Sequence, residues 1–375
     1  MENAFQALGL DEPRYAFRPS LWERINGNTT NLRQVWFPGN HGNVGGGWPD
    51  QQIANITLAC KQPVHLGRSL WKRQRLIVCL GMCDQLSSIG VEFNLSRVKT
   101  IFMEGLRYSA AHPFPYVPST KKLLSHSISD LWSSRPPAPW ATTPIFRLQQ
   151  SSKEATHRDA DDCDGTDKHP SGTPSELQTQ FAPRPWSLGQ TRYPTNAILL
   201  LAGTVARRPG RTMRVDGDTN ADIEDAPLLR TGERVHSSVR VRLACNGLET
   251  DDAGVWQCVP LLGSSDNEGA ERLWRLEKGS GFAAGEVGPS KPKELEHAQY
   301  PESNLYPVEA GDSEWRWVFS SRPEGIGNSQ VPQETVLPEE PMVGYWERYL
   351  LALTVGELDV WKWAQQNPPL TGSAC

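Results

Sequence analysis

Residues Val35–Gly39 (VWFPG) run directly into Asn40–Gly47 (NHGNVGGG), and this junction indicates the fold class. A short apolar run ending at a Pro-Gly pair is typical of a buried strand. Asp50 then precedes a segment whose apolar residues have helical spacing, namely Ile53, Ile56 and Leu58. This pattern predicts a helix capped by Asp50. His41 is therefore expected in a glycine-rich loop between a strand and a helix, where ligands and catalytic groups gather in open α/β sheets.

His41 is the one catalytic candidate that this pattern indicates. From the residues alone, a histidine in such a loop is as compatible with a hydrogen-bonded structural role as with a general base. A phosphate-binding loop is disfavoured because no Lys-Ser or Lys-Thr pair follows the glycines and the spacing is not G-x-G-x-x-G. The seven cysteines form no C-x-x-C pair, so we predict no metal site, no disulfide framework and no cofactor.

The composition predicts folded segments separated by disordered ones. Only 38% of the 375 residues are hydrophobic, while Gly (32) and Pro (30) are both frequent. A net charge of −5 favours no nucleic-acid partner, and the basic stretch Arg68–Arg75 is the only local argument for one. The chain has no apolar run of the ~18 residues needed to span a membrane, and its first residues do not resemble a secretory signal. We expect a reducing, cytoplasmic setting.

Three N-terminal segments together resemble an uncharacterised α/β-hydrolase-like family, whose bacterial relatives are the catalytic domains of type VI secretion phospholipase effectors. The segments are Phe5–Glu12, Phe17–Trp22 and Val35–Gly47, and the resemblance extends from Met1 to about Asn94. Two later segments look like the C-terminal extension of the fungal members of that family: Arg234–Arg240 and Gly344–Leu350.

The resemblance implies a role for His41. In that family the nucleophile is a serine in a Gly-x-Ser-x-Gly elbow, an acidic residue follows it, and both precede the Phe5–Glu12 match. The family's histidine corresponds to His41 and is the general base, in the order Ser, acid, His that α/β-hydrolases use. This sequence departs at Asn43, where the family commonly has Asp, and it contains no such elbow; Gly67–Trp71 comes nearest but lacks the second glycine. The resemblance thus predicts the C-terminal part of an α/β-hydrolase-like domain, inactive as it stands.

The order of segments predicts three parts: residues 1–135 as the hydrolase-like portion, 136–192 as a disordered linker and 193–375 as a β-rich accessory unit with a C-terminal helix. Ser151–Pro185 is rich in Asp, Ser, Thr, Gly and Pro, too polar to offset its ordering entropy. The alternation in Ser238–Leu243 and the apolar run Trp315–Phe319 predict strands, and Met342–Trp363 has the spacing of a helix.

Residues 60–81 interrupt the helix that begins near Asp50, and we predict that they are a translated intron. Pro63 would disrupt a helix interior, whereas joining Ala59 through one Trp to Met82 restores an amphipathic pattern up to Ile89. Members of the resembling family read Leu-Ala-Trp-Met at this place. The codons for Cys60-Lys61 can contain a splice donor, and those for Leu80-Gly81 an acceptor. The alternative is a genuine surface insertion.

Two functions from different classes remain open on the sequence. One is a fragment of a serine hydrolase of lipase, esterase or phospholipase type, whose substrate in complete form would be a carboxylic ester or a phospholipid. The other is a non-enzymatic interaction module in which the histidine loop is vestigial and the tryptophan-rich C-terminal part binds a partner.

Overall fold

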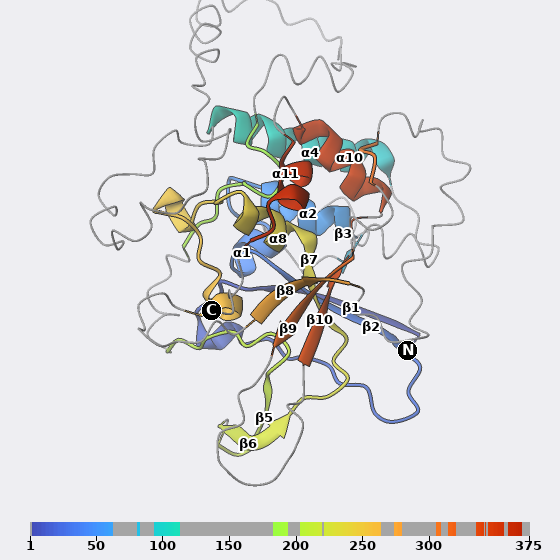
Figure 1. Ribbon diagram of the computed structural model, residues 1–375, viewed down its shortest axis with the longest axis vertical. Coiled ribbons are helices and arrows are strands. Elements are labelled where there is room, and N and C mark those ends of the chain that lie inside the picture. The colour runs from blue at the N-terminus through green and yellow to red at the C-terminus, as the bar shows by residue number, and fades with distance from the viewer. Residues whose placement is uncertain are drawn as a thin grey trace, which may run out of the picture.

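The computed structural model describes most of the N-terminal region and a set of later segments (Figure 1). These are residues 2–62, 81–82, 94–112, 183–193, 203–219, 221–263, 274–279, 305–308, 314–319, 335–340, 342, 344–355 and 359–369. Three sequence-based expectations fall outside them: the disordered linker over 136–182, the basic stretch 68–75 and most of the interrupting segment, 63–80.

A six-stranded, mostly parallel sheet forms the centre of the molecule. Its order is β1-β2-β7-β10-β9-β8. The first three pairings in this order are parallel and the last two are antiparallel. The strands are β1 (Asn3–Gly9), β2 (Asn31–Phe37), β7 (Glu233–His236), β10 (Thr335–Glu340), β9 (Trp315–Phe319) and β8 (Trp274–Lys278). The mixed α/β class is thus confirmed.

β2 is a central strand because its side chains are buried on both faces, as parallel sheets require. Val35 and Phe37 belong to one apolar cluster, whereas Trp36 belongs to the cluster on the opposite face. All three side chains are at most 1% exposed. The buried strand predicted at Val35–Phe37 is confirmed.

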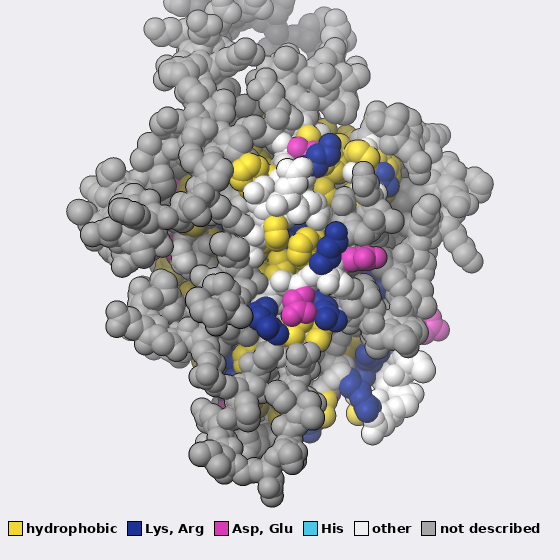
Figure 2. All heavy atoms as spheres, viewed as in Figure 1, with side chains coloured by type: hydrophobic (Ala, Val, Ile, Leu, Met, Phe, Trp, Pro, Cys, Tyr) yellow, Lys and Arg dark blue, Asp and Glu magenta, His cyan; other side chains and the backbone are white. Residues whose placement is uncertain are grey.

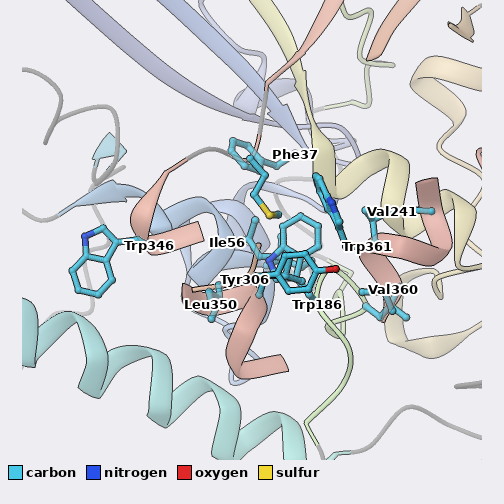
Figure 3. Packing of buried hydrophobic residues seen from close by; sticks show 14 of the residues in the cluster. Phe37, Ile56, Trp186, Val241, Tyr306, Trp346, Leu350, Val360 and Trp361 are labelled. Carbon is cyan, nitrogen blue, oxygen red and sulfur yellow. The ribbon is translucent and has the colours of Figure 1, made fainter. Parts of the chain in front are cut away.

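Helices cover the face of the sheet that carries Val35 and Phe37 (Figure 1). They are α1 (His41–Gly45), α2 (Gln52–Ala59), α4 (Leu95–Ala111), α8 (Ser237–Ala244), α10 (Tyr345–Thr354) and α11 (Val360–Gln366). Figure 3 shows aromatic and aliphatic side chains from distant segments converging under this layer, among them Ile56, Trp186 and Trp361. The rings of Trp186 and Trp361 meet edge to face at 6.0 Å. The predicted α2 cap is confirmed, since Asp50 Oδ1 accepts a hydrogen bond from the Gln52 backbone N–H at 2.9 Å.

The opposite face carries a second apolar cluster, centred on Trp36, Trp274 and Trp317. The remaining described elements are short: the 3₁₀ helices η1 (Tyr15–Phe17) and η4 (Thr250–Asp252), helix α9 (Val259–Leu262), and two ribbons, β3 (Cys60–Gln62) with β4 (Gly81–Met82) and β5 (Met213–Val215) with β6 (Asp222–Pro227). Charged side chains of both signs lie next to apolar ones over β8–β10 (Figure 2).

The central sheet contains strands from both of the units that the sequence analysis predicts to be separate. β2 pairs with β7, Gln34 lying opposite Glu233 and Trp36 opposite Val235. The accessory unit expected at 193–375 therefore contributes four strands to this sheet, and among its described residues only the ribbon of β5 and β6 is its own. The end of the expected linker, 183–192, is also packed, because Trp186 and Leu188 are at most 1% exposed.

Two secondary-structure predictions were wrong. Ser238–Leu243 lies in helix α8 and is not a strand. Its alternation of Val and Arg arises because both residue types are buried, with Val239 and Val241 in opposite clusters and Arg240 paired with Glu339. The helix predicted over Met342–Trp363 is two helices, α10 and α11, the second capped by the Asp359 side chain.

Candidate active site

The end of strand β2 places His41 at the surface. After Phe37 the chain turns at Gly39, whose φ of +90° favours glycine. A Cβ on Gly39 would lie 2.6 Å from Cβ of Asn43, so a larger residue would also clash. His41 is then the first residue of α1, and its side chain is exposed. The predicted strand before His41 and the helix capped by Asp50 are both present, but His41 starts the short helix α1 where a loop was predicted.

Asn40 anchors the loop. It is fully buried, and its Oδ1 accepts hydrogen bonds from the backbone N–H groups of Gly42 (2.9 Å) and Asn43 (3.2 Å). Asn43 Oδ1 accepts in return from the Asn40 backbone N–H at 3.1 Å, which completes a capping box. Asn40 Nδ2 donates to the carbonyl of Arg192, tying the loop to a segment far away in the chain. Asn43 Oδ1 thus acts as a hydrogen-bond acceptor. The carboxylate of an Asp, which the resembling family commonly has at this position, could accept the same hydrogen bond.

Two carboxylates that follow β1 hold the same loop from the side. Asp11 Oδ2 accepts from the Gly39 backbone N–H at 2.6 Å, and Glu12 Oε2 accepts from the His41 backbone N–H at 3.1 Å. Burial raises the pKa of Asp11. Burial also acts to raise the pKa of Glu12, but hydrogen bonds from Arg14 and from the His41 backbone outweigh it, so this pKa is lowered. Both acids directly follow the apolar end of β1, a signal that the sequence analysis did not use.

The occupied backbone amides limit what this loop can do. The N–H groups of His41, Gly42 and Asn43 all donate within the protein, to Glu12 or Asn40. An oxyanion hole or a phosphate-binding loop needs such donors aimed at the ligand. In the described conformation the glycine-rich loop therefore acts as a rigid mount for the histidine.

The His41 imidazole lies at the C-terminal edge of the parallel strands. Its ring centroid is 4.9 Å from that of Phe17, and the Arg14 guanidinium lies 3.9 Å from the centroid of the same Phe17 ring. An exposed imidazole with a fixed backbone can accept a proton from a nucleophile brought against it. The chain contains no Gly-x-Ser-x-Gly elbow to supply that nucleophile.

A second histidine makes a triad-like contact set that the sequence analysis missed. His236 Nδ1 lies 2.8 Å from Ser238 Oγ, and its Nε2 lies 2.8 Å from Glu347 Oε1. All three residues are buried: His236 and Ser238 are 0% exposed and Glu347 is 4% exposed. The His236 ring also stacks on Phe37, with 4.5 Å between centroids. No substrate can reach this set, so we assign it a structural role linking β7, α8 and α10.

The tautomer of His236 follows from its partners. The Ser238 backbone N–H can only donate, and it points at Nδ1 from 3.1 Å. Nδ1 must therefore be the acceptor, and the proton of the neutral ring lies on Nε2, where it donates to Glu347. His236 in this way caps helix α8 with its ring.

Comparison with known proteins identifies a relative for the N-terminal part. Residues 1–60 match the model of the catalytic domain of Tle1-like type VI secretion phospholipase effectors. This match includes β1, β2, α1 and the complete His41 loop, so the resemblance read from the sequence is confirmed over these residues. Neither the curated proteins nor the solved structures gave a match. None of the described helices is both long and apolar enough to cross a membrane.

Proposed function

We propose that this chain is part of a serine ester hydrolase of the phospholipase-effector type, in which His41 is the general base. The observation that carries the proposal is an exposed imidazole at the C-terminal end of a buried parallel strand, inside the residues that match the phospholipase catalytic domain. In the resembling family the nucleophilic serine and the acid precede the histidine in the chain, and we extend that order to this protein. An α/β-hydrolase fold for the complete domain is part of this proposal.

The rigid mount of His41 supports the proposal. A general base must keep its position relative to the nucleophile to within fractions of an ångström. The backbone N–H groups from Asn40 to Asn43 donate four hydrogen bonds to side-chain oxygens of Glu12, Asn40 and Asn43, and these bonds fix the backbone. His41 itself is exposed at the molecular surface, as a general base that meets a substrate must be.

The test uses the chain extended by its upstream coding sequence, in wild-type form and as His41→Gln. His112→Gln is the matched control, since His112 is an exposed histidine at the end of α4. We expect hydrolysis of 4-nitrophenyl butyrate or of phospholipid vesicles by the wild type. The His41→Gln variant should lose activity by a factor on the order of 10³ or more, as removal of a triad base does, and the His112→Gln variant should keep it.

Two results would overturn the assignment. Full activity in His41→Gln would exclude the residue as the base. The absence of any in-frame Gly-x-Ser-x-Gly sequence upstream would favour the interaction-module alternative. The 375-residue chain alone should not hydrolyse short acyl esters above a mock preparation, because it has no nucleophile elbow to use with His41.

A further inference from the structure

A pocket is lined in part by Asp11 and Glu12, the two residues that also hold the His41 loop. Its volume is about 540 Å³, within the range of sites that hold small organic ligands. Much of its lining is apolar and comes from Leu10, Val205, Val259 and Trp274. Trp274 belongs to β8, Leu10 directly follows β1, and Val259 begins α9, so three separate parts of the fold meet here. Figure 1 shows β8 and β1 as members of one sheet.

The acidic residues of this pocket are already satisfied. Asp11 accepts from the Trp256 indole N–H at 3.0 Å and from the Gly39 backbone. Glu12 forms a two-pronged ion pair with Arg14, with distances of 2.6 and 2.7 Å. Neither carboxylate is left to attract a cation. Arg207, a third charged group of the lining, is likewise occupied, because it donates to the backbone carbonyls of Arg14 and Phe17.

Two further arginines of the pocket lack such compensation. The guanidinium of Arg211 lies 4.1 Å from the centroid of the Phe319 ring, and among the described residues no carboxylate pairs with it. Arg208 has a single loose ion pair, 3.7 Å from Asp222, and its side chain is 57% exposed. Such a pair contributes little. Burial lowers the pKa of Arg211, and the charge of the neighbouring Arg208 lowers it further. Two like charges are thus held close together beside an apolar floor.

The turn that carries both arginines is fixed before any ligand arrives. The Arg211 backbone N–H donates to the Arg208 carbonyl at 3.0 Å. Between them, the Gly210 N–H donates to Glu233 Oε1 at 2.9 Å. Gly210 has φ +65°, and a Cβ there would lie 3.1 Å from the Trp274 ring, so the turn rests directly on the pocket floor. Preorganised charges of this kind lower the entropy cost of binding.

We propose that this pocket binds an organic oxyanion, a carboxylate or a phosphate carried on an apolar body. The oxyanion would lie on Arg208 and Arg211, which can each donate two hydrogen bonds to it. The apolar body would lie against Val205, Val259 and Trp274. This site needs no nucleophile, so it stands whether or not His41 is a catalytic base. The two sites share Glu12, which lines the pocket and holds the His41 backbone.

Calorimetric titration of the 375-residue chain tests the proposal with four probes: octyl phosphate, octanoate, octanol and inorganic phosphate. We expect saturable binding of at least one octyl oxyanion, weakened by added salt, and much weaker binding of octanol and inorganic phosphate. Comparison of octyl phosphate with octanoate then identifies the preferred headgroup. Binding of inorganic phosphate as tight as that of octyl phosphate, or no binding of either octyl oxyanion, would overturn the proposal.

Variants localise the site. Arg211→Ala should weaken binding roughly tenfold or more, as loss of a charge-assisted hydrogen bond does. Arg208→Ala should weaken binding as well. Because the Arg208 side chain is exposed, this variant should unfold at the same temperature as the wild type. Arg214→Ala is the matched control, because Arg214 pairs with Glu23 outside the pocket. Equal affinities for the wild type and both pocket variants would refute the assignment.

Discussion

Acidification should destabilise this protein through His236, because the folded structure has room for the neutral ring only. A proton on Nδ1 would face the Ser238 N–H donor, and the ring is fully enclosed. Burial lowers the pKa of His236 to about 4 from its ordinary 6.5, although Glu340 and Glu339 act to raise it. Glu347 also faces the ring, and it accepts the Nε2 proton of the neutral form.

The size of the effect follows from proton linkage. Between pH 6.5 and 4 the unfolded chain binds a proton at this histidine that the folded protein does not bind. Stability therefore falls as the pH falls, by about 2 kcal/mol between pH 7 and 5, and by about 3 kcal/mol once the pH is below 4. A folded-state pKa above 6.5 would reverse the sign and make the protein more stable in acid.

Urea unfolding at pH 7, 6 and 5 measures this effect, with His236→Gln as the comparison. Glutamine can still donate to Glu347 but cannot titrate, so the variant carries a constant loss from the missing α8 cap, about 1 kcal/mol. The stability of the wild type minus that of the variant should fall by about 2 kcal/mol between pH 7 and 5, from about +1 to about −1 kcal/mol. An advantage of the wild type that stays constant with pH would refute the reasoning.

Two other substitutions have calculable consequences. Asn40→Ala removes the hydrogen-bond acceptor of two loop amides and the donor to the Arg192 carbonyl. The free energy of unfolding should therefore fall by about 2 kcal/mol, and a protease should cleave the His41 loop faster. If neither quantity changes, Asn40 does not anchor the loop. Glu339→Ala leaves the fully buried Arg240 without its ion pair and should cost about 3–5 kcal/mol, while the double variant Arg240→Met/Glu339→Leu should recover most of that loss. A double variant no more stable than Glu339→Ala in denaturant melts would show that packing, and not the unpaired charge, sets the cost.

Local patterns predicted the parts of the fold that depend on neighbouring residues. The apolar run at Val35–Phe37, the Pro-Gly stop and the Asp50 cap each act within a few residues, and the structure has all three. Trp315–Phe319 is a strand with the predicted bounds. The setting of His41 follows directly from these local features.

The missed features depend on contacts between distant segments. The helical state of Ser237–Ala244 requires Glu339, about a hundred residues later, to neutralise Arg240, and without that partner a Val-Arg alternation has the pattern of a half-buried strand. Glu340 similarly bridges Arg33 on β2 and Arg234 on β7. No local pattern encodes which carboxylate meets which arginine. The merging of the two expected units in one sheet was therefore not predictable from the sequence alone.

Sequence and structure together support the replacement of residues 60–81 by a single Trp. Helix α2 ends at Ala59, and the next described residues form a small antiparallel ribbon in which Lys61 lies opposite Met82 and Gln62 opposite Gly81. The two ends of the segment thus lie side by side, so its removal needs no long-range rearrangement. The match to the phospholipase catalytic domain also stops at residue 60. We propose that these residues are a translated intron and that the working protein continues from Ala59 through a single Trp to Met82.

A chain with Trp in place of residues 60–81 tests this proposal at the protein level, and transcript sequencing across the junction tests it at the level of the message. Removal of five basic residues and no acidic one changes the formal net charge from −5 to −10.

If α2 continues through the junction, the Trp variant should unfold at a higher temperature than the present chain. Gly in place of Trp at the same junction should then cost about 0.5 kcal/mol through helix propensity alone, and more through the lost ring. A genuine surface insertion predicts the opposite: the shortened chains would be less stable than the present one, Trp and Gly junctions would behave alike, and mature transcripts would uniformly retain the segment. The intron and insertion hypotheses thus differ in whether α2 continues through the junction. Only if one helix runs through it should the stability of the shortened chain depend on which residue joins the two parts.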